Sequence, residues 1–334
     1  MPQPWTPDSI AAALRSYQSA CIIMAAAELE LFPSLAATPT TAAALAAKRS
    51  LDLRGTTILL DALAALGLLL KSADTYALAP GVADVLTPTG RHSHYAMTLH
   101  QATCLRKWSR LADTIKSGTP TAVPPSVRGA AADHQAFIEA MNDISGPLAP
   151  ALVADINSIP FTHLLDVGGA TGTYTIAFLN ANPHATATLF DLPTVIPLAR
   201  TRLAAAKLAH RVTLAPGDFT TDELPASPRP DYIWVSAIIH QQSRQENVAL
   251  YAKCFRALAP AGHIAIRDMV MDDSHTQPVA GALFAVNMLA ATPTGNTFSL
   301  AEIRVDLESA GFQNIQQIRP DPGMHAVIVA QKPQ

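Results

Sequence analysis

A glycine-rich turn between an apolar run and a helical pattern constrains the fold of this chain more than any other feature. Residues 164–172 read Leu-Leu-Asp-Val-Gly-Gly-Ala-Thr-Gly, and the apolar positions before the glycines predict a buried strand. The glycines allow a tight turn and a close approach of the backbone to a ligand. Residues 173–180 continue with helical periodicity, and a second predicted strand ends at Asp191, 23 residues after Gly168. A carboxylate at this spacing is typical of acids that bind ribose hydroxyls.

The register of the glycines argues against a dinucleotide. The pattern Gly-x-Gly-x-x-Gly serves a pyrophosphate, whereas here Asp166 precedes the adjacent Gly168 and Gly169, and Gly172 closes the turn. An acid before adjacent glycines favours a cationic nucleoside without phosphate, which predicts S-adenosylmethionine (SAM). Two alternatives remain open at this point: a glycine turn without a ligand, and a nicotinamide-dependent dehydrogenase, which the glycine register disfavours.

Residues 158–334 alternate strand and helix patterns. This alternation predicts an α/β domain with a doubly wound parallel sheet, whose ligands bind at the carboxyl ends of the strands. The expected strands are 163–167, 187–191, 211–215, 231–236, 262–267, 313–318 and 325–331. The expected helices are 173–181, 194–208, 245–258, 279–290 and 299–309.

The ends of the third, fourth and fifth predicted strands carry side chains suited to chemistry. Gly217, Asp218 and Phe219 follow the third strand, where a carboxylate and an aromatic ring suit an adenine base. His240 follows the fourth strand, and an imidazole with an ordinary pKa of ~6.5 suits proton abstraction near neutral pH. Asp268 ends the neighbouring strand, where it can hold one ring nitrogen of His240. A structural histidine and a surface carboxylate are the alternatives.

The N-terminal part predicts a winged helix over residues 1–100, followed by a helical bridging segment over 101–157. A helix from Pro7 to about Leu31, two more at 42–49 and 53–66, and a hairpin at 68–78 make up the expected winged helix. A winged helix can bind DNA or form a dimer. Residues 1–100 hold six Lys/Arg and seven Asp/Glu, which disfavours a ligand-responsive DNA regulator, because DNA binding needs several cations.

Length and composition bound the partners and the compartment. A chain of 334 residues that is 49% apolar has room for two domains with cores of their own. Its 15% charged residues and net charge of −3 disfavour nucleic acid or a membrane as the main partner. The three cysteines, Cys21, Cys104 and Cys254, show no metal spacing and are odd in number, which predicts a cytoplasmic protein without a metal site.

The chain resembles the plant-type small-molecule O-methyltransferases. This family of class I SAM-dependent methyltransferases includes caffeate, acetylserotonin and hydroxyneurosporene methyltransferases and many bacterial natural-product enzymes. The likeness covers nearly the whole chain, and the order and spacing of its motifs carry it, because each motif alone is weak. The motifs are residues 63–69 (Leu-Ala-Ala-Leu-Gly-Leu-Leu), Trp108, 137–142 (Phe-Ile-Glu-Ala-Met-Asn), the glycine turn, 190–193 (Phe-Asp-Leu-Pro), 217–219, His240 and 310–312 (Ala-Gly-Phe).

The resemblance implies an N-terminal winged-helix dimerisation domain, a C-terminal Rossmann-like SAM-binding domain and an intertwined homodimer. It implies that His240 takes a proton from a hydroxyl of a small, partly aromatic metabolite, while Asp268 orients the base. The oxygen then attacks the sulfonium methyl, and S-adenosylhomocysteine leaves. The implied cofactor-binding residues are Asp166, Gly168, Gly169, Gly172, Asp191, Leu192, Gly217, Asp218, Phe219 and Ser236. The implied acceptor-binding residues are Trp108, Met141, Asn142, Phe284, Asn287 and Met288.

The chain departs from the family pattern beside the base. The family reads His-Asp-Trp where this sequence has His240-Gln241-Gln242. A family lysine is replaced by Ser236, and a second acid by Thr297. These departures keep a second hypothesis open, in which the chain methylates nitrogen or carbon, or uses SAM without methyl transfer.

Overall fold

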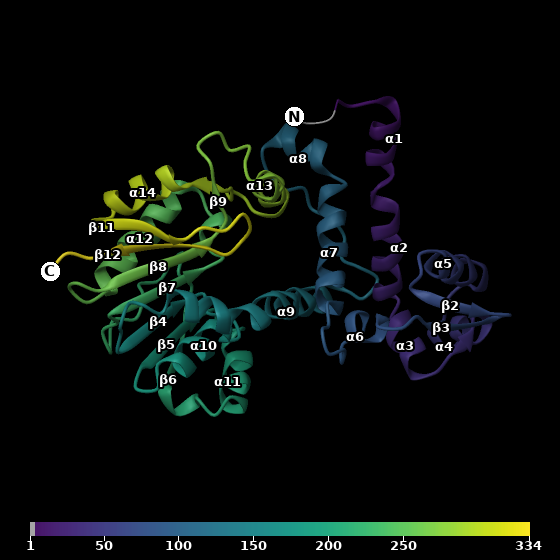
Figure 1. The fold of residues 1–334 in the computed structure, drawn as a ribbon, viewed down its shortest axis with the longest axis horizontal. Helices are drawn as coiled ribbons and strands as arrows, with labels where there is room; N and C mark the ends of the chain where they lie inside the picture. The colour runs from purple at the N-terminus through teal and green to yellow at the C-terminus, as the bar shows by residue number, and fades with distance from the viewer. Residues whose placement is uncertain (1–3) are drawn as a thin grey trace. The chain divides into compact units, whose positions relative to one another are not determined.

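The structure, a computed structural model, describes residues 4–334 and divides into two compact units (Figure 1). Unit 1 comprises the chain up to Arg106 together with Val123–Asp143, and unit 2 comprises Lys107–Ala122 and Ile144–Gln334. The long helix α9 (Ala130–Ile156) contributes to both. The predicted bridging segment 101–157 is therefore divided between two units, each with hydrophobic cores of its own.

The described part of unit 1 combines helices with a small antiparallel sheet. Its strands follow the order β1-β3-β2. They are β1 (Thr40–Thr41), β2 (Leu69–Ser72) and β3 (Thr75–Leu78). The helices are α1 (Pro7–Arg15), α2 (Tyr17–Glu28), α3 (Leu31–Ala37), α4 (Ala42–Arg49), α5 (Leu53–Ala65), α6 (Val82–Leu86), α7 (Tyr95–Trp108) and the first half of α9.

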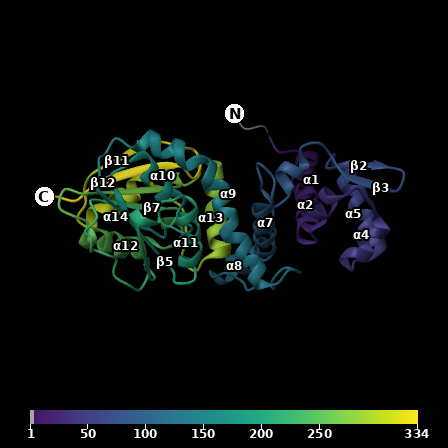
Figure 2. The same ribbon diagram turned by 90° about the horizontal axis from the view of Figure 1, so that it is seen from below.

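The predicted helices at 42–49 and 53–66 are confirmed as α4 and α5, and the hairpin as β2 and β3. Polar caps explain where the helices begin: Thr41 Oγ1 accepts the N–H of Ala44, and the Asp52 carboxylate accepts that of Gly55. Gly67, with φ of 77°, supplies the left-handed residue just after α5. The hairpin lies beside α5 (Figure 2).

The single helix predicted from Pro7 to about Leu31 is wrong in its extent. The chain forms two helices that meet at Ser16, and α2 ends at Glu28 before the left-handed residue Glu30 (φ 56°). No residue of α1 is buried. By length and composition alone, the segment Pro7–Glu28 is long and apolar enough to cross a membrane, a test that core helices also pass. The expected lack of a membrane partner therefore stays a prediction.

A mixed sheet forms the centre of unit 2, with strand order β11-β12-β8-β7-β4-β5-β6 (Figure 1). Five neighbouring strands are parallel, whereas β12 is antiparallel to both of its neighbours. The predicted parallel sheet is therefore confirmed for these five strands, whereas the direction of β12 departs from it. The strands are β4 (His163–Val167), β5 (Thr186–Asp191), β6 (Val212–Pro216), β7 (Tyr232–Ser236), β8 (His263–Asp268), β11 (Gln313–Arg319) and β12 (Ala326–Gln331).

Helices cover both faces of this sheet, as predicted for a doubly wound fold. One face packs against α10, α11 and the second half of α9, and the other packs against α12 and α14. Two short strands, β9 (Val270–Met271) and β10 (Phe298–Ser299), pair outside the main sheet. The helices are α8 (Leu111–Ser117), α10 (Thr173–Ala181), α11 (Ile196–Ala205), α12 (Arg244–Ala257), α13 (Val279–Ala291), α14 (Leu300–Ser309), and the 3-10 turns η1 (Ala209–Arg211) and η2 (Ile239–Gln241).

Candidate active site

The glycine turn leads from β4 into α10 at the carboxyl edge of the sheet. Gly168 and Gly172 have φ values of 65° and 84°, and Ala170 is also left-handed at 48°. A Cβ atom at Gly168 would lie 2.6 Å from the Cδ1 atom of Ile238, and one at Gly169 would lie 2.9 Å from Asp166. Neighbouring side chains already occupy the space that a Cβ atom would need at these two positions, which explains the glycines.

Asp191 joins the end of β5 to the glycine turn. Its Oδ2 atom accepts the N–H of Ala170 at 2.7 Å, and its Oδ1 atom accepts that of Leu192 at 2.7 Å. Burial raises the pKa of Asp191, and these two backbone donors act in the opposite direction. Each carboxylate oxygen keeps a second lone pair for a ribose hydroxyl. Leu192 is exposed beside it.

Asp166 lies beneath the turn. Its side chain is buried, and Oδ2 accepts a hydrogen bond from Thr175 Oγ1 at 2.6 Å. Burial raises the pKa of Asp166 to about 7, to which the nearby charge of Asp191 contributes. This predicted cofactor-binding residue thus supports the turn from the α10 side.

The end of β6 lies next to the same turn. Gly217 is required there because a Cβ atom would lie 2.4 Å from the ring of Phe190. The Asp218 Oδ1 atom accepts hydrogen bonds from the N–H and hydroxyl of Thr220, which lower the pKa of Asp218. Phe219 lies 3.6 Å from the Cβ position of Gly168. An aromatic ring and a carboxylate are therefore available beside the turn.

His240 and Asp268 form a buried pair at the ends of β7 and β8. The Nδ1 atom of His240 lies 2.7 Å from Oδ1 of Asp268, and the two side chains are 8% and 1% exposed. Because an ionised carboxylate only accepts hydrogen bonds, this geometry places a proton on Nδ1 of His240. Within residues 4–334, no hydrogen bond involves Nε2 of His240. The contact with Asp268 therefore fixes the orientation of the imidazole ring.

The turn η2 that carries His240 is held by groups that the sequence analysis missed. Asn296 donates its N–H to the carbonyl of His240 at 3.0 Å. The amide of Asn247 donates to the carbonyl of Ile239 at 3.0 Å. A Cβ atom at Gly295 would lie 2.5 Å from the same His240 carbonyl. The Gly295-Asn296 pair is a turn signal in the sequence, whereas nothing near Asn247 predicts its role.

Three predicted acceptor-binding residues lie on α13. Phe284 packs edge-on against the His240 ring, with ring centroids 4.9 Å apart. Asn287 accepts a hydrogen bond from the indole nitrogen of Trp108 at 2.9 Å. Met288 is buried on the same helix. The structure thus brings Trp108 into contact with Asn287 of α13, and Phe284 of the same helix into contact with His240.

Met141 and Asn142 lie on α9 within unit 1 and are both half-buried. Their predicted role in acceptor binding stays a prediction.

The residues that replace the family pattern have different environments. Gln241 is exposed and donates from Nε2 to the Ala237 carbonyl at 2.9 Å. Gln242 is buried, and among residues 4–334 its Oε1 atom finds no hydrogen-bond partner. Thr297 is also buried, and its hydroxyl lies 3.5 Å from the Gly281 carbonyl.

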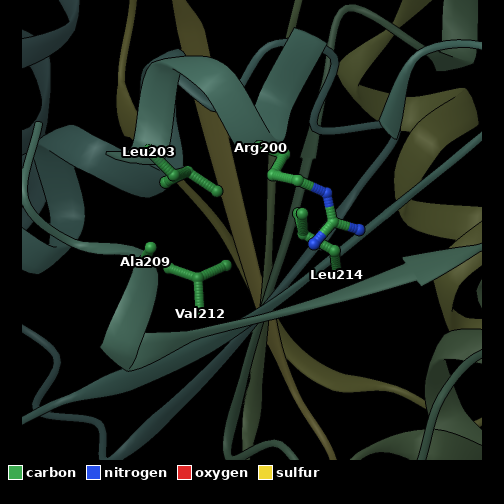
Figure 3. A pocket seen from close by; sticks show the side chains of 5 residues that line it. All are labelled: Arg200, Leu203, Ala209, Val212 and Leu214. Atoms are coloured by element: carbon green, nitrogen blue, oxygen red, sulfur yellow. The ribbon is translucent and has the colours of Figure 1, made fainter. Parts of the chain in front are cut away.

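A hollow of about 160 Å³ lies elsewhere, between α11 and β6 (Figure 3). Figure 3 shows Arg200 and Leu203 on the helix above Val212 and Leu214 of the strand. Val212 begins β6, at the end opposite to Gly217. The hollow contains none of the predicted site residues and is not part of the candidate active site.

Comparison with known families gives two matches that together span most of the chain. Residues 10–89 match an O-methyltransferase dimerisation domain, and residues 108–313 match an O-methyltransferase domain.

The chain is also similar to individual methyltransferases of known sequence or structure. The tetracenomycin polyketide synthesis 8-O-methyl transferase of Streptomyces glaucescens is 30% identical over 93% of this chain and 92% of its own. The L-tyrosine C(3)-methyltransferase of Streptomyces lavendulae is 31% identical over 92% of this chain and 88% of its own. The structure of human N-acetylserotonin methyltransferase in complex with SAM has a TM-score of 0.82 at 22% identity, with all of both chains covered, which shows the same fold.

Proposed function

We propose that this chain, which belongs to the SAM-dependent O-methyltransferase family, transfers a methyl group from SAM to a hydroxyl of a small, partly aromatic metabolite, with His240 as the general base. The observation that carries the proposal is the buried pair of His240 and Asp268, whose Nδ1 and Oδ1 atoms lie 2.7 Å apart. Family membership supports the reaction class, and the pair supplies the proton acceptor that a hydroxyl needs.

The carboxyl edge of the sheet fits the donor. When bound, SAM supplies a methyl group on a positively charged sulfur. The Asp191 carboxylate is available to ribose hydroxyls, and Asp218 and Phe219 are available to the adenine. The left-handed turn at Gly168 and Gly172 would bring its backbone close to the nucleoside. These residues would hold SAM, with S-adenosylhomocysteine as the product.

A general base such as His240 would determine how readily the acceptor hydroxyl loses its proton. A phenol has an ordinary pKa of ~10, so almost none of it is ionised at neutral pH. A positioned base such as His240 Nε2 contributes roughly 10²–10⁴-fold to such a step. Asp268 holds the imidazole in the tautomer that accepts at Nε2 and stabilises the imidazolium that forms. The ring of Phe284, which packs edge-on against the imidazole, would be a neighbour of the bound acceptor.

A second candidate function is methylation of carbon or nitrogen, or a SAM-dependent reaction without methyl transfer. The buried Gln242, with its unpartnered Oε1 atom, favours this candidate, because the family pattern has an aromatic residue there. The relative from Streptomyces lavendulae, named for methylation of tyrosine at C(3), shows that the family includes such chemistry.

Unit 1 matches a dimerisation domain, and we infer that the chain is a homodimer. The α1 region has apolar side chains for such an interface, since Trp5 and Leu14 are 71% and 70% exposed. Sedimentation equilibrium tests this inference, and a monomer at micromolar concentration would contradict it. We infer a cytoplasmic location from the odd number and the wide spacing of the three cysteines, Cys21, Cys104 and Cys254.

The proposed function is tested by product analysis with methyl-deuterated SAM. Aromatic acceptors are offered in matched pairs that carry a hydroxyl or an amino group on the same ring. An O-methyl ether formed with one equivalent of S-adenosylhomocysteine supports the proposal. Label found on nitrogen or ring carbon supports the second candidate instead. Binding of neither SAM nor S-adenosylhomocysteine contradicts both.

A further inference from the structure

Arg267 is a buried cation without an acidic partner. Its side chain is 2% exposed, yet within residues 4–334 no carboxylate forms an ion pair with its guanidinium. Nη1 donates to Ser236 Oγ at 3.0 Å, and Nε and Nη2 lie 3.2 and 2.7 Å from Nδ1 of His325. The guanidinium also lies over the ring of Tyr174 at 5.3 Å. A buried charge is costly unless an opposite charge pairs with it, so this cation requires an explanation.

The surroundings of Arg267 place it at the candidate active site. It precedes Asp268 on β8 and packs on the opposite face of the sheet, towards Tyr174. Tyr174 lies two residues after Gly172, the last glycine of the turn. Ser236 is the last residue of β7 and pairs with Arg267 across the sheet. The guanidinium therefore lies between the glycine turn and the strand end that precedes His240.

The strand order predicts which part of SAM reaches Ser236. Asp218 and Phe219 follow β6, Asp191 ends β5, and the glycine turn follows β4. The next strand along the sheet is β7, about 14 Å from β6 at a strand spacing of ~4.8 Å. With adenine over β6 and ribose at Asp191, the amino-acid end of the molecule lies over β4 and β7. That end carries a carboxylate.

The Ser236 hydroxyl is oriented to meet an anion. Its oxygen accepts a hydrogen bond from Arg267, so its own proton points elsewhere. Ser236 is half-buried, whereas Arg267 is covered. A ligand carboxylate therefore reaches the hydroxyl, and the guanidinium behind it supplies the positive charge.

The family resemblance already implies that Ser236 binds the cofactor. We propose that Arg267 is a positioning residue, which orients and polarises the Ser236 hydroxyl so that it donates a hydrogen bond to the methionine carboxylate of SAM. The family resemblance places a lysine at the position of Ser236, and the β7–β8 register supplies a cation from the neighbouring strand instead. This inference rests on the proposed use of SAM.

The test compares SAM with decarboxylated SAM, which lacks only that carboxylate, by calorimetric titration of the full chain. The wild-type protein binds SAM about 10- to 100-fold more tightly than the decarboxylated form. Arg267→Gln and Ser236→Ala each remove most of this preference and leave the affinity for decarboxylated SAM unchanged. Arg267→Lys, which keeps a cation, restores part of it.

Arg319→Gln is the matched control. Arg319 also contacts His325, through the backbone carbonyl at 2.7 Å, but it already pairs with Asp155 and Asp321. The control keeps the wild-type preference for SAM.

Equal losses for both ligands in Arg267→Gln and Ser236→Ala would assign the cluster a purely structural role and overturn the inference. Ser236→Ala keeps the test decisive where Arg267→Gln does not fold. If the wild-type protein binds SAM but shows no preference over the decarboxylated form, only this inference fails; if it binds neither, the proposed function fails as well.

Discussion

The candidate active site has two regions with different composition. The proposed donor half lies at the ends of β4, β5 and β6, and the proposed acceptor half lies at the ends of β7 and β8 and along α13. At the ends of β4, β5 and β6, side chains are combined with a special backbone: Gly168 and Gly172 adopt left-handed conformations, and the Asp191 carboxylate accepts two backbone N–H groups. At the ends of β7 and β8 and along α13, the site consists of side chains, with His240, Asp268 and Phe284 in contact. If the proposed roles hold, the nucleoside contacts none of the residues around His240, which leaves the acceptor side free to vary. Relatives of this chain accordingly carry names for methylation at oxygen and at carbon.

The largest expected effect separates the two halves by function. His240→Ala lowers kcat by roughly 10²–10⁴-fold, because the acceptor loses its base. The dissociation constant for SAM stays unchanged, because His240 belongs to the acceptor half. Steady-state kinetics and calorimetric titration measure the two quantities, with the exposed His210→Ala as control. Full activity in His240→Ala would remove the base assignment.

A glycine substitution tests whether the donor half depends on the backbone. Gly168→Ala destabilises the protein by about 2–5 kcal/mol, from left-handed strain and from the contact at 2.6 Å with Ile238. Gly118→Ala is the matched control, because Gly118 has φ of 73° and, apart from its two chain neighbours, no atom of the described residues lies within 4 Å of its Cβ position. The control costs only about 1–2 kcal/mol of strain. Equal free energies of unfolding for the two variants, measured in urea, would show that the turn is not crowded.

The buried Asp166 beneath the glycine turn makes the free energy of unfolding depend on pH. Because the folded-state pKa of Asp166 is raised from 3.8 to about 7, the folded state binds the extra proton. The stabilisation by this group is complete below pH 3.8 and is lost as the pH rises through about 7. Between pH 5 and pH 8 the wild-type protein loses roughly 2–3 kcal/mol that Asp166→Asn retains. Urea unfolding of both proteins at the two pH values measures this, and parallel curves would refute it.

The smallest expected effect concerns the ribose acid. Asp191→Asn weakens SAM binding about 10-fold, because one charged acceptor is lost. Its kcat at saturating SAM stays near the wild-type value, which contrasts with His240→Ala. The exposed carboxylate of Asp113 on α8 provides the control variant Asp113→Asn. An unchanged dissociation constant in Asp191→Asn would contradict the assignment.

The sequence predicts those parts of the fold and of the candidate site that depend on local signals. The strand 163–167 and the helix 173–181 match β4 and α10 residue for residue, because the apolar run, the glycines and the helical period are all local signals. The positions of Asp191, His240 and Asp268 at strand ends follow from the same alternation. Their pairing follows because neighbouring parallel strands end at one edge of the sheet.

The remaining features depend on contacts between distant segments. The reversed direction of β12 is set by pairing with β8, and its apolar residues 326–330 fit a parallel strand equally well. The short strands β9 and β10 have two residues each, too few for a periodic pattern. The link from Arg267 to Ser236 depends on sheet register, which the two local sequences do not contain.

The central claim, that His240 removes the proton from the acceptor hydroxyl, is tested most directly with phenolic acceptors of graded acidity. The ratio of wild-type to His240→Ala turnover is measured for each member of a series on one ring skeleton at fixed pH. The ratio falls towards one as the phenol becomes acidic enough to ionise in solution, because an ionised acceptor needs no base. A ratio that stays the same across the series would contradict the claim and assign His240 to acceptor binding alone.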